Sequence, residues 1–181
     1  VYTNANGNYS VPHFYDRDAT LTFKIAPQIL GYNYGGEINV WSSQSCDNIK
    51  NKNFTVTLKP TPICMVSVSE TGHNIVVWEK PDINVISGFK IYRESNVANM
   101  YDSIGYVPYT ETAVFEDANS EPTTKAYRYK IGTVTTYNGA ETDLSGEHKT
   151  IHLTINKGIG NSWNLIWSAY EGLDISTYKL Y

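Results

Sequence analysis

The 181-residue sequence lacks most features that mark enzymes, membrane proteins and nucleic-acid-binding proteins. No run of about 18 apolar residues is present, so membrane insertion is not expected. The net charge is −4, whereas nucleic-acid-binding proteins usually carry a basic face, so a nucleic-acid partner is not expected either. No serine or cysteine lies in a G-x-S-x-G context, and no glycine-rich loop follows a strand and opens a helix. We therefore expect no enzymatic activity, no catalytic residues and no cofactor.

Cysteine is scarce, and the two cysteines, Cys46 and Cys64, are not expected to pair. The strand expected over 53–59 runs away from the loop that holds Cys46. Ten extended residues from Phe54 to Cys64 put the thiols on the order of 30 Å apart, whereas a disulfide needs Cα atoms roughly 6 Å apart. We expect Cys64 to be a small buried hydrophobic residue, and Cys46 could pair only outside this sequence.

Metal-binding and carboxylate motifs are equally sparse. His148 and His152 have the spacing that chelates zinc on a helix, but on a strand they would lie about 13 Å apart. We therefore expect no metal site. The carboxylates are scattered over predicted turns, and Asp117 is expected to be a turn residue that accepts a bond from its own backbone.

Aromatic residues are plentiful, with 15 Tyr and four Trp, and they suit sheets that have one solvated face. Alternating β-branched and aromatic runs are bounded by Gly, Asn, Asp and Pro, and every candidate amphipathic helix is interrupted by these residues. The sequence predicts an all-β protein. The expected strands are 20–25, 37–42, 53–59, 63–68, 74–79, 88–93, 102–107, 113–116, 126–135, 146–155, 163–167 and 176–181.

One pattern occurs twice, 89 residues apart. Ile75-Val76-Val77-Trp78 matches Asn164-Leu165-Ile166-Trp167, and Phe89-Lys90-Ile91-Tyr92 matches Tyr178-Lys179-Leu180-Tyr181. A fixed period of this size indicates tandem domains. Because the second copy stops in mid-pattern, we expect the chain to be a piece of a longer modular protein.

The repeat and a proline-rich tripeptide divide the sequence into three segments. Pro60-Thr61-Pro62 separates two sheets, because proline cannot donate to a β-ladder. The repeat offset places a second boundary near Thr150. We expect a partial β-domain over 1–60, a complete seven-stranded sandwich over 61–150, and the first three strands of another unit over 151–181. Lacking a covering sheet, residues 163–181 should be more exposed than 74–92.

The middle segment resembles a fibronectin type III domain, which is a two-sheet β-sandwich. The resemblance rests on Trp78, on Phe89-Lys90-Ile91-Tyr92-Arg93 and on Tyr127-Arg128-Tyr129-Lys130-Ile131. It implies that Trp78 lies buried between the sheets. It also implies that Tyr127 is a tyrosine corner, whose hydroxyl bonds to a nearby backbone group.

The first segment resembles an immunoglobulin-like or PKD-like module. The residues that carry the resemblance are Glu37-Ile38-Asn39-Val40-Trp41 and Asn53-Phe54-Thr55-Val56-Thr57-Leu58. Such modules often precede fibronectin domains in large secreted or surface bacterial proteins. The resemblance therefore implies an extracellular or cell-surface location.

Two functions are compatible with this sequence. The first is a non-catalytic segment that spaces or presents neighbouring domains of the same chain. The alternative is an accessory module that binds a glycan or an extracellular protein, as in an adhesin or an exported enzyme. Tyrosines in predicted loops could stack on sugars: Tyr32, Tyr34, Tyr101, Tyr109 and Tyr137.

Overall fold

The computed structural model describes residues 20–23, 32–34, 38–41, 56–82, 85–136 and 139–179. These residues form strands, turns and irregular segments, with no helix among them, which confirms the all-β prediction. It follows that no helix in these ranges could cross a membrane. The chain divides into two compact units, one of residues 1–28 and 34–56 and the other of residues 29–33 and 57–181.

The first unit contains a described antiparallel pair, β1 (Thr20–Phe23) with β3 (Ile38–Trp41). β2 (Tyr32–Tyr34), which was not predicted, pairs with β4 (Val56–Leu58). The predicted strands 20–25, 37–42 and 53–59 overlap β1, β3 and β4. Most of the expected partial domain over 1–60 lies outside the described residues, and so does Cys46.

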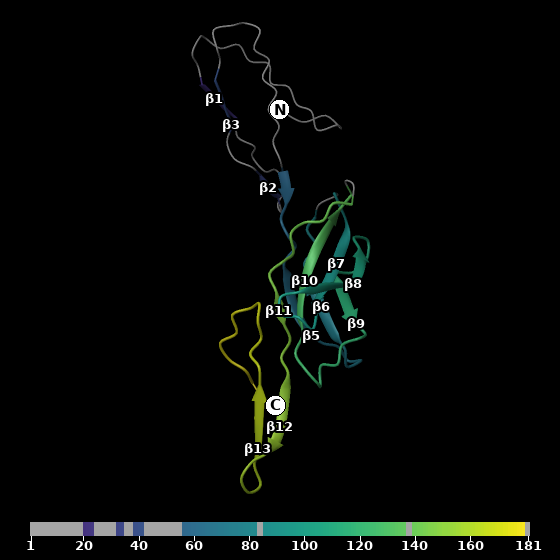
Figure 1. Ribbon diagram of the computed structural model, residues 1–181, viewed down its shortest axis with the longest axis vertical. Coiled ribbons are helices and arrows are strands. Elements are labelled where there is room, and N and C mark those ends of the chain that lie inside the picture. Colours follow the sequence, from purple (N-terminus) through teal and green to yellow (C-terminus); the bar gives the residue numbers. More distant parts are fainter. Residues whose placement is uncertain are drawn as a thin grey trace. The chain divides into compact units, whose positions relative to one another are not determined.

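The second unit contains two sheets that pack as a sandwich (Figure 1). One sheet has the order β5-β6-β9, formed by β5 (Ile63–Val68), β6 (Asn74–Trp78) and β9 (Val114–Asp117). The other has the order β11-β10-β7-β8, formed by β7 (Ile86–Glu94), β8 (Tyr101–Pro108), β10 (Arg128–Thr135) and β11 (His148–Lys149). These seven strands form a β-sandwich, which is the predicted fold class.

The core lies between these sheets and is rich in aromatic residues. Trp78 is 3% exposed, as predicted, and its ring centroid lies 5.3 Å from that of Phe89. Tyr129 and Ile131, which share a face by two-residue periodicity, are fully buried with Ile91 in the same cluster. The aromatic spacing of the sequence therefore identified the centre of the sandwich.

Strand β5 contains a bulge that overturns the prediction for Cys64. Ile63 pairs with Trp78, but the next paired residue is Met65, opposite Val77. The extra residue shifts the alternation, so that Ile63 and Val66 face inward while Cys64 is exposed. Cys64 is therefore not a buried hydrophobic residue. It forms no disulfide, in agreement with the prediction that it does not pair with Cys46.

Two further predictions in the sandwich are confirmed. The backbone N–H of Glu121 donates to the Tyr127 hydroxyl at 3.0 Å, which is the expected tyrosine corner. Asp117 is a turn residue whose Oδ1 accepts from the backbone N–H of Asn119 at 3.2 Å. The sequence did not indicate that the same buried carboxylate also pairs with Arg93 at 2.8 Å and accepts from Tyr129 at 2.8 Å.

After the sandwich, the chain forms a hairpin of β12 (Leu153–Lys157) and β13 (Trp163–Trp167). The predicted continuous strand 146–155 is wrong, because it divides into β11 and β12, which belong to different sheets. Thr150 separates them: its N–H donates to the Tyr127 carbonyl, and its hydroxyl accepts from the Tyr127 N–H. The strand predicted over 176–181 is not formed in its described part, 176–179.

Candidate interaction surfaces

The β12–β13 hairpin repeats the pairing of β5 and β6 at four consecutive residue pairs. In the sandwich Val66 pairs with Val76, and in the hairpin Ile155, 89 positions after Val66, pairs with Leu165, 89 positions after Val76. The same correspondence holds at four consecutive pairs, from Met65↔Val77 to Val68↔Asn74 and from Thr154↔Ile166 to Lys157↔Trp163. The repeat read from the sequence is therefore also a repeat of strand register.

The two hairpins differ in burial. Val76 and Trp78 are at most 3% exposed, whereas their counterparts Leu165 and Trp167 are 36% and 37% exposed. Trp163 is more exposed still, as expected for this segment; Leu180 lies outside the described residues. Lys157 is the one charged residue from 151 to 167, and Leu153, Ile155 and Ile166 are exposed as well, so one hairpin carries several exposed apolar side chains. Contiguous exposed apolar patches commonly mark interaction sites.

One core contact of the sandwich has a counterpart on this surface. Tyr178 occupies the repeat position of Phe89, and its ring centroid lies 5.9 Å from that of Trp167. Residues 175–179 are not a strand, but Tyr178 nevertheless covers the tryptophan that corresponds to Trp78. The exposed face thus already carries one aromatic contact of the kind found at the centre of the sandwich.

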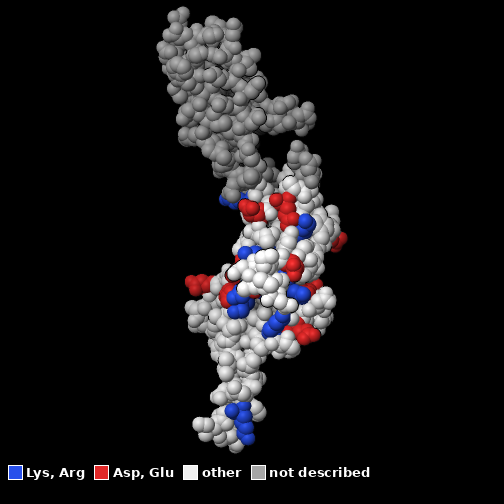
Figure 2. All heavy atoms as spheres, viewed as in Figure 1, with Lys and Arg blue, Asp and Glu red and all other residues white. Residues whose placement is uncertain are grey.

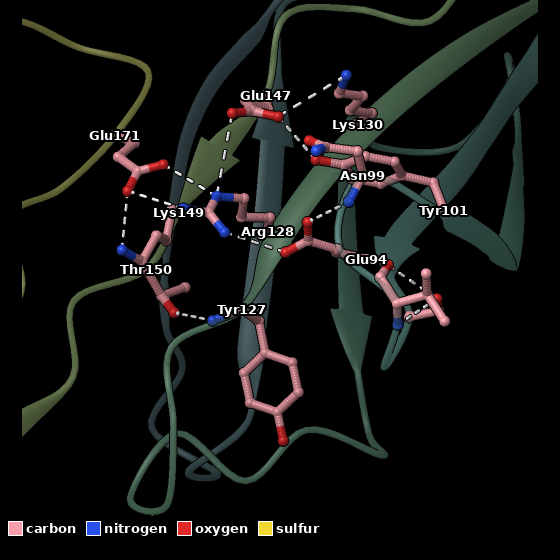
Figure 3. A network of polar contacts seen from close by, with 12 residues as sticks. Glu94, Asn99, Tyr101, Tyr127, Arg128, Lys130, Glu147, Lys149, Thr150 and Glu171 are labelled. Atoms are coloured by element: carbon pink, nitrogen blue, oxygen red, sulfur yellow. Dashed lines mark hydrogen bonds and ion pairs between the residues drawn. The ribbon is translucent and has the colours of Figure 1, made fainter.

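A polar network covers the outer face of the four-stranded sheet, where β10 and β11 meet (Figure 3). Alternation along β10 sends Tyr129 into the core and therefore turns Arg128 and Lys130 outward. The Arg128 guanidinium donates to Glu171 through Nε at 2.9 Å and through Nη2 at 3.0 Å. Its Nη1 pairs with Glu94 at 3.1 Å. This bidentate geometry is the strong form of an arginine–carboxylate pair.

Glu171 lies beyond the hairpin but is bound to the last strand of the sandwich. Lys149 Nζ lies 2.8 Å from Glu171 Oε1, and the backbones of the two residues form an antiparallel bridge. Hydrogen bonds from Arg128 and from Lys149 lower the pKa of Glu171 to about 2, because they stabilise its charged form. The carboxylate is therefore ionised at neutral pH and ties two strands of the sandwich to segment 168–173.

The preceding residue, Tyr170, reaches the edge of the other sheet. Its hydroxyl accepts from the backbone N–H of Val66 on edge strand β5 at 2.8 Å, and it lies 2.8 Å from His148 Nδ1. The two rings meet edge to face, with centroids 5.7 Å apart, and Tyr170 packs against the core cluster. Burial raises the pKa of Tyr170 and lowers that of His148, so both groups are favoured in their neutral forms.

Glycine is required two residues after this tyrosine. Gly172 has a φ of 109°, which other residues rarely adopt, and a Cβ at this position would lie 2.4 Å from the His148 ring. His152 makes a separate contact, in which its Nε2 lies 3.0 Å from the Thr123 carbonyl oxygen. His148 and His152 thus have different partners, and the described ranges contain no cluster of three residues that could hold a metal.

The tyrosines that could form a sugar platform are not brought together where the structure describes them. Tyr101 and Tyr109 lie at and just beyond opposite ends of β8. The Tyr101 hydroxyl donates to Glu147 at 2.8 Å, and that of Tyr109 donates to the Pro81 carbonyl at 2.7 Å. The side chains of Tyr32, Tyr34 and Tyr137 lie outside the described residues.

A polar groove of about 580 Å³ lies near one end of the sandwich, beside the tyrosine corner. Its lining combines two basic residues, Arg93 and Lys125, with three acidic residues, Glu94, Asp102 and Glu121. Figure 2 shows the same mixture of signs over the visible face of the sandwich. The groove therefore has no strong preference for a ligand of one charge.

No protein-family model matches this sequence, and no curated protein does. Several solved structures are similar at low identity. Pectate lyase PelI from Erwinia chrysanthemi is 23% identical, with a TM-score of 0.40, over 50% of this chain and 27% of the lyase chain. The matched part thus spans about a quarter of that enzyme.

An Fn3-like protein from Clostridium thermocellum is 20% identical, with a TM-score of 0.39, over 49% of this chain and 84% of its own. A structure described as a myokine is 18% identical, with a TM-score of 0.38, over 51% and 96% of the two chains. At these values the likenesses carry no functional inference. The β-sandwich assignment rests on the sheets and core of this chain.

Sequence reasoning missed Tyr170, Glu171 and Gly172. The repeat places the first two opposite Pro81 and Asp82, in a loop between strands. Nothing in the sequence indicates that this loop contacts the preceding sandwich. The available signal was the tripeptide Tyr170-Glu171-Gly172, and it is a weak one.

Proposed function

We propose that this chain is a non-catalytic segment of an extracellular or cell-surface modular protein, in which it spaces or presents neighbouring domains. The observation that carries the proposal is the repeated strand register of β5–β6 and β12–β13, 89 residues apart. A register repeated in this way is typical of tandem modules, each of which is one structural unit. The partners of the segment are then the neighbouring domains of the same chain.

Features of the sandwich support a fibronectin type III-like module. They are the buried Trp78, the tyrosine corner formed by Tyr127, and the packing of a three-stranded sheet on a four-stranded one. We further propose that 151–181 begins a second module of the same kind and that 1–60 belongs to an immunoglobulin-like or PKD-like module. The bacterial, exported setting follows from the sequence resemblance.

The alternative, an accessory module that binds a glycan or an extracellular protein, is favoured by the polar groove beside the tyrosine corner. A screen against a glycan array and a panel of matrix proteins distinguishes the two functions. The spacer proposal predicts no saturable binding. Saturable binding that Lys125→Ala weakens and the distant Lys90→Ala does not would overturn it in favour of the binding module.

A further inference from the structure

Residues 168–173, which follow β13, join the hairpin to the sandwich through backbone and side-chain contacts. In the hairpin copy, Ser168–Leu173 lies against β11 and the edge of β5. The segment makes a backbone bridge between Glu171 and Lys149, in which the Lys149 N–H donates at 2.9 Å and the Glu171 N–H at 3.4 Å. Edge strands present unpaired backbone groups, and this bridge pairs part of such an edge.

Consecutive residues of the segment contact different parts of the sandwich. Tyr170 reaches Val66 on one sheet and His148 on the other, while Glu171 pairs with Arg128 and Lys149. A side chain that bonds to both sheets resists sliding of the segment in either direction. The charged contacts hold its register along β11.

The chain that leads into the hairpin is held as well. The Ser168 N–H donates to the His152 carbonyl at 3.3 Å, and His152 contacts Thr123. The Thr150 N–H donates to the Tyr127 carbonyl, and the Thr150 hydroxyl accepts from the Tyr127 N–H. The chain is therefore bonded to the same end of the sandwich both before it enters the hairpin and after it leaves it. A flexible linker would have no such double attachment.

The corresponding segment of the first copy behaves differently. Lys80 donates from Nζ to the carbonyl oxygens of Tyr109 at 2.9 Å and Glu111 at 2.8 Å, both in its own sandwich. Pro81 and Asp82 stand where the second copy has Tyr170 and Glu171. The contacts of Tyr170 and Glu171 therefore depend on side chains that the first copy does not have at the matching positions.

We propose that the end of the sandwich formed by Val66, Arg128, His148 and Lys149 is a docking site for segment 168–173 of the following module, which it holds at a fixed angle. The inference rests on the proposed repeat. It deepens the spacer function, because docked modules form a stiff rod, whereas modules on free linkers reorient independently. The occupant is the loop of the next module in the same chain, recognised through its tyrosine, its glutamate and its glycine.

Distance measurements between spin labels test this docking. Labels are placed at Ser103→Cys on β8 and Asn161→Cys in the β12–β13 turn, both exposed, in a chain whose own cysteines are serine. The parent should give one narrow distance distribution. Glu171→Gln should broaden it, because the amide is isosteric but loses both ion pairs. Tyr170→Phe should broaden it through loss of the hydroxyl bonds, and the combined variant should broaden it most.

Glu70→Gln, which removes a charge from the exposed β5–β6 turn, is the matched control and should leave the distribution narrow. Amide exchange of β10 and β12 is measured on every variant, so that loss of folding is recognised. A broad distribution in the parent, or narrow ones in all variants, overturns the docking proposal while β12–β13 pairing stands. Loss of that pairing in the parent would instead overturn the repeat on which the proposed function rests.

Discussion

The β5–β6 and β12–β13 hairpins have the same register but different surroundings. In the first, the inward residues Val76 and Trp78 meet Phe89 and Tyr129 from the opposite sheet. In the second, Leu165 and Trp167 remain more than a third exposed, although Tyr178 contacts the tryptophan. Strand pairing is thus a local property of the repeated pattern, while burial depends on the sheet that covers it. Two strands alone are marginally stable in water.

The largest expected effect separates the two tryptophans. Trp78→Ala should lower the free energy of unfolding by about 3–5 kcal/mol, because it leaves a cavity in the sandwich core. Trp167→Ala should lower it by about 1 kcal/mol or less, since its surroundings are already solvated. Denaturant unfolding followed by circular dichroism measures both. Equal losses of stability would mean that the two tryptophans are buried to a similar extent.

Hydrogen exchange should distinguish the hairpins next. Amides of β6 are held by β5 and β9 and by the core, so they should exchange through global unfolding. Amides of β13 have β12 as their one described strand neighbour and should exchange orders of magnitude faster. Residue-resolved exchange by NMR gives the comparison. Similar protection in Val76 and Leu165 would contradict the difference in burial.

A smaller effect should be confined to the sandwich. Tyr127→Phe removes the hydroxyl that accepts from the Glu121 N–H and should cost about 1 kcal/mol. Protection in β6 should fall while that in β13 stays the same. Tyr106→Phe, at an exposed position on β8, provides the control and should change neither hairpin. If protection in β13 also fell, the sandwich and the β12–β13 hairpin would be energetically coupled, which the structure does not indicate.

The smallest effect concerns the pH dependence of the joint. The pKa of Glu171 is lowered from 4.5 to about 2, so its contribution to stability is present above pH 4.5 and is lost as the pH falls towards 2. The Glu171 carboxyl should therefore titrate near pH 2 in a carbon-detected NMR experiment. Arg128→Gln should raise that midpoint. A midpoint near 4.5 in the parent would show that the carboxylate is not docked.

Much of the sandwich could be predicted because its signals are local. Two-residue alternation identifies the buried face of β10, and the aromatic spacing identifies Trp78 and the tyrosine corner at Tyr127. Cys64 could not be placed this way, because one bulged residue reverses the face of everything on one side of it. The strand break at Thr150 was missed for a similar reason, since hydrogen bonds to Tyr127 decide it.

The candidate site was less accessible to sequence reasoning. Tyr101 and Tyr109 were candidates for stacking on sugar under the alternative function, but their hydroxyls bond to Glu147 and to the Pro81 carbonyl. The joint depends on Tyr170 and Glu171, whose partners lie 22 or more residues away in the chain. Neither periodicity nor composition indicates which distant strand a loop will contact.

The sequence by itself determined the all-β class, the 89-residue repeat and the residues at the centre of the sandwich, because alternation and aromatic spacing act over a few residues. Tertiary structure alone decided that Cys64 faces outward and that the strand breaks at Thr150. It also decided that Glu171 lies between Arg128 and Lys149, and that Tyr170 bonds to both sheets. These outcomes depend on which surfaces meet after the strands have formed, and such contacts produce no periodic pattern in the sequence.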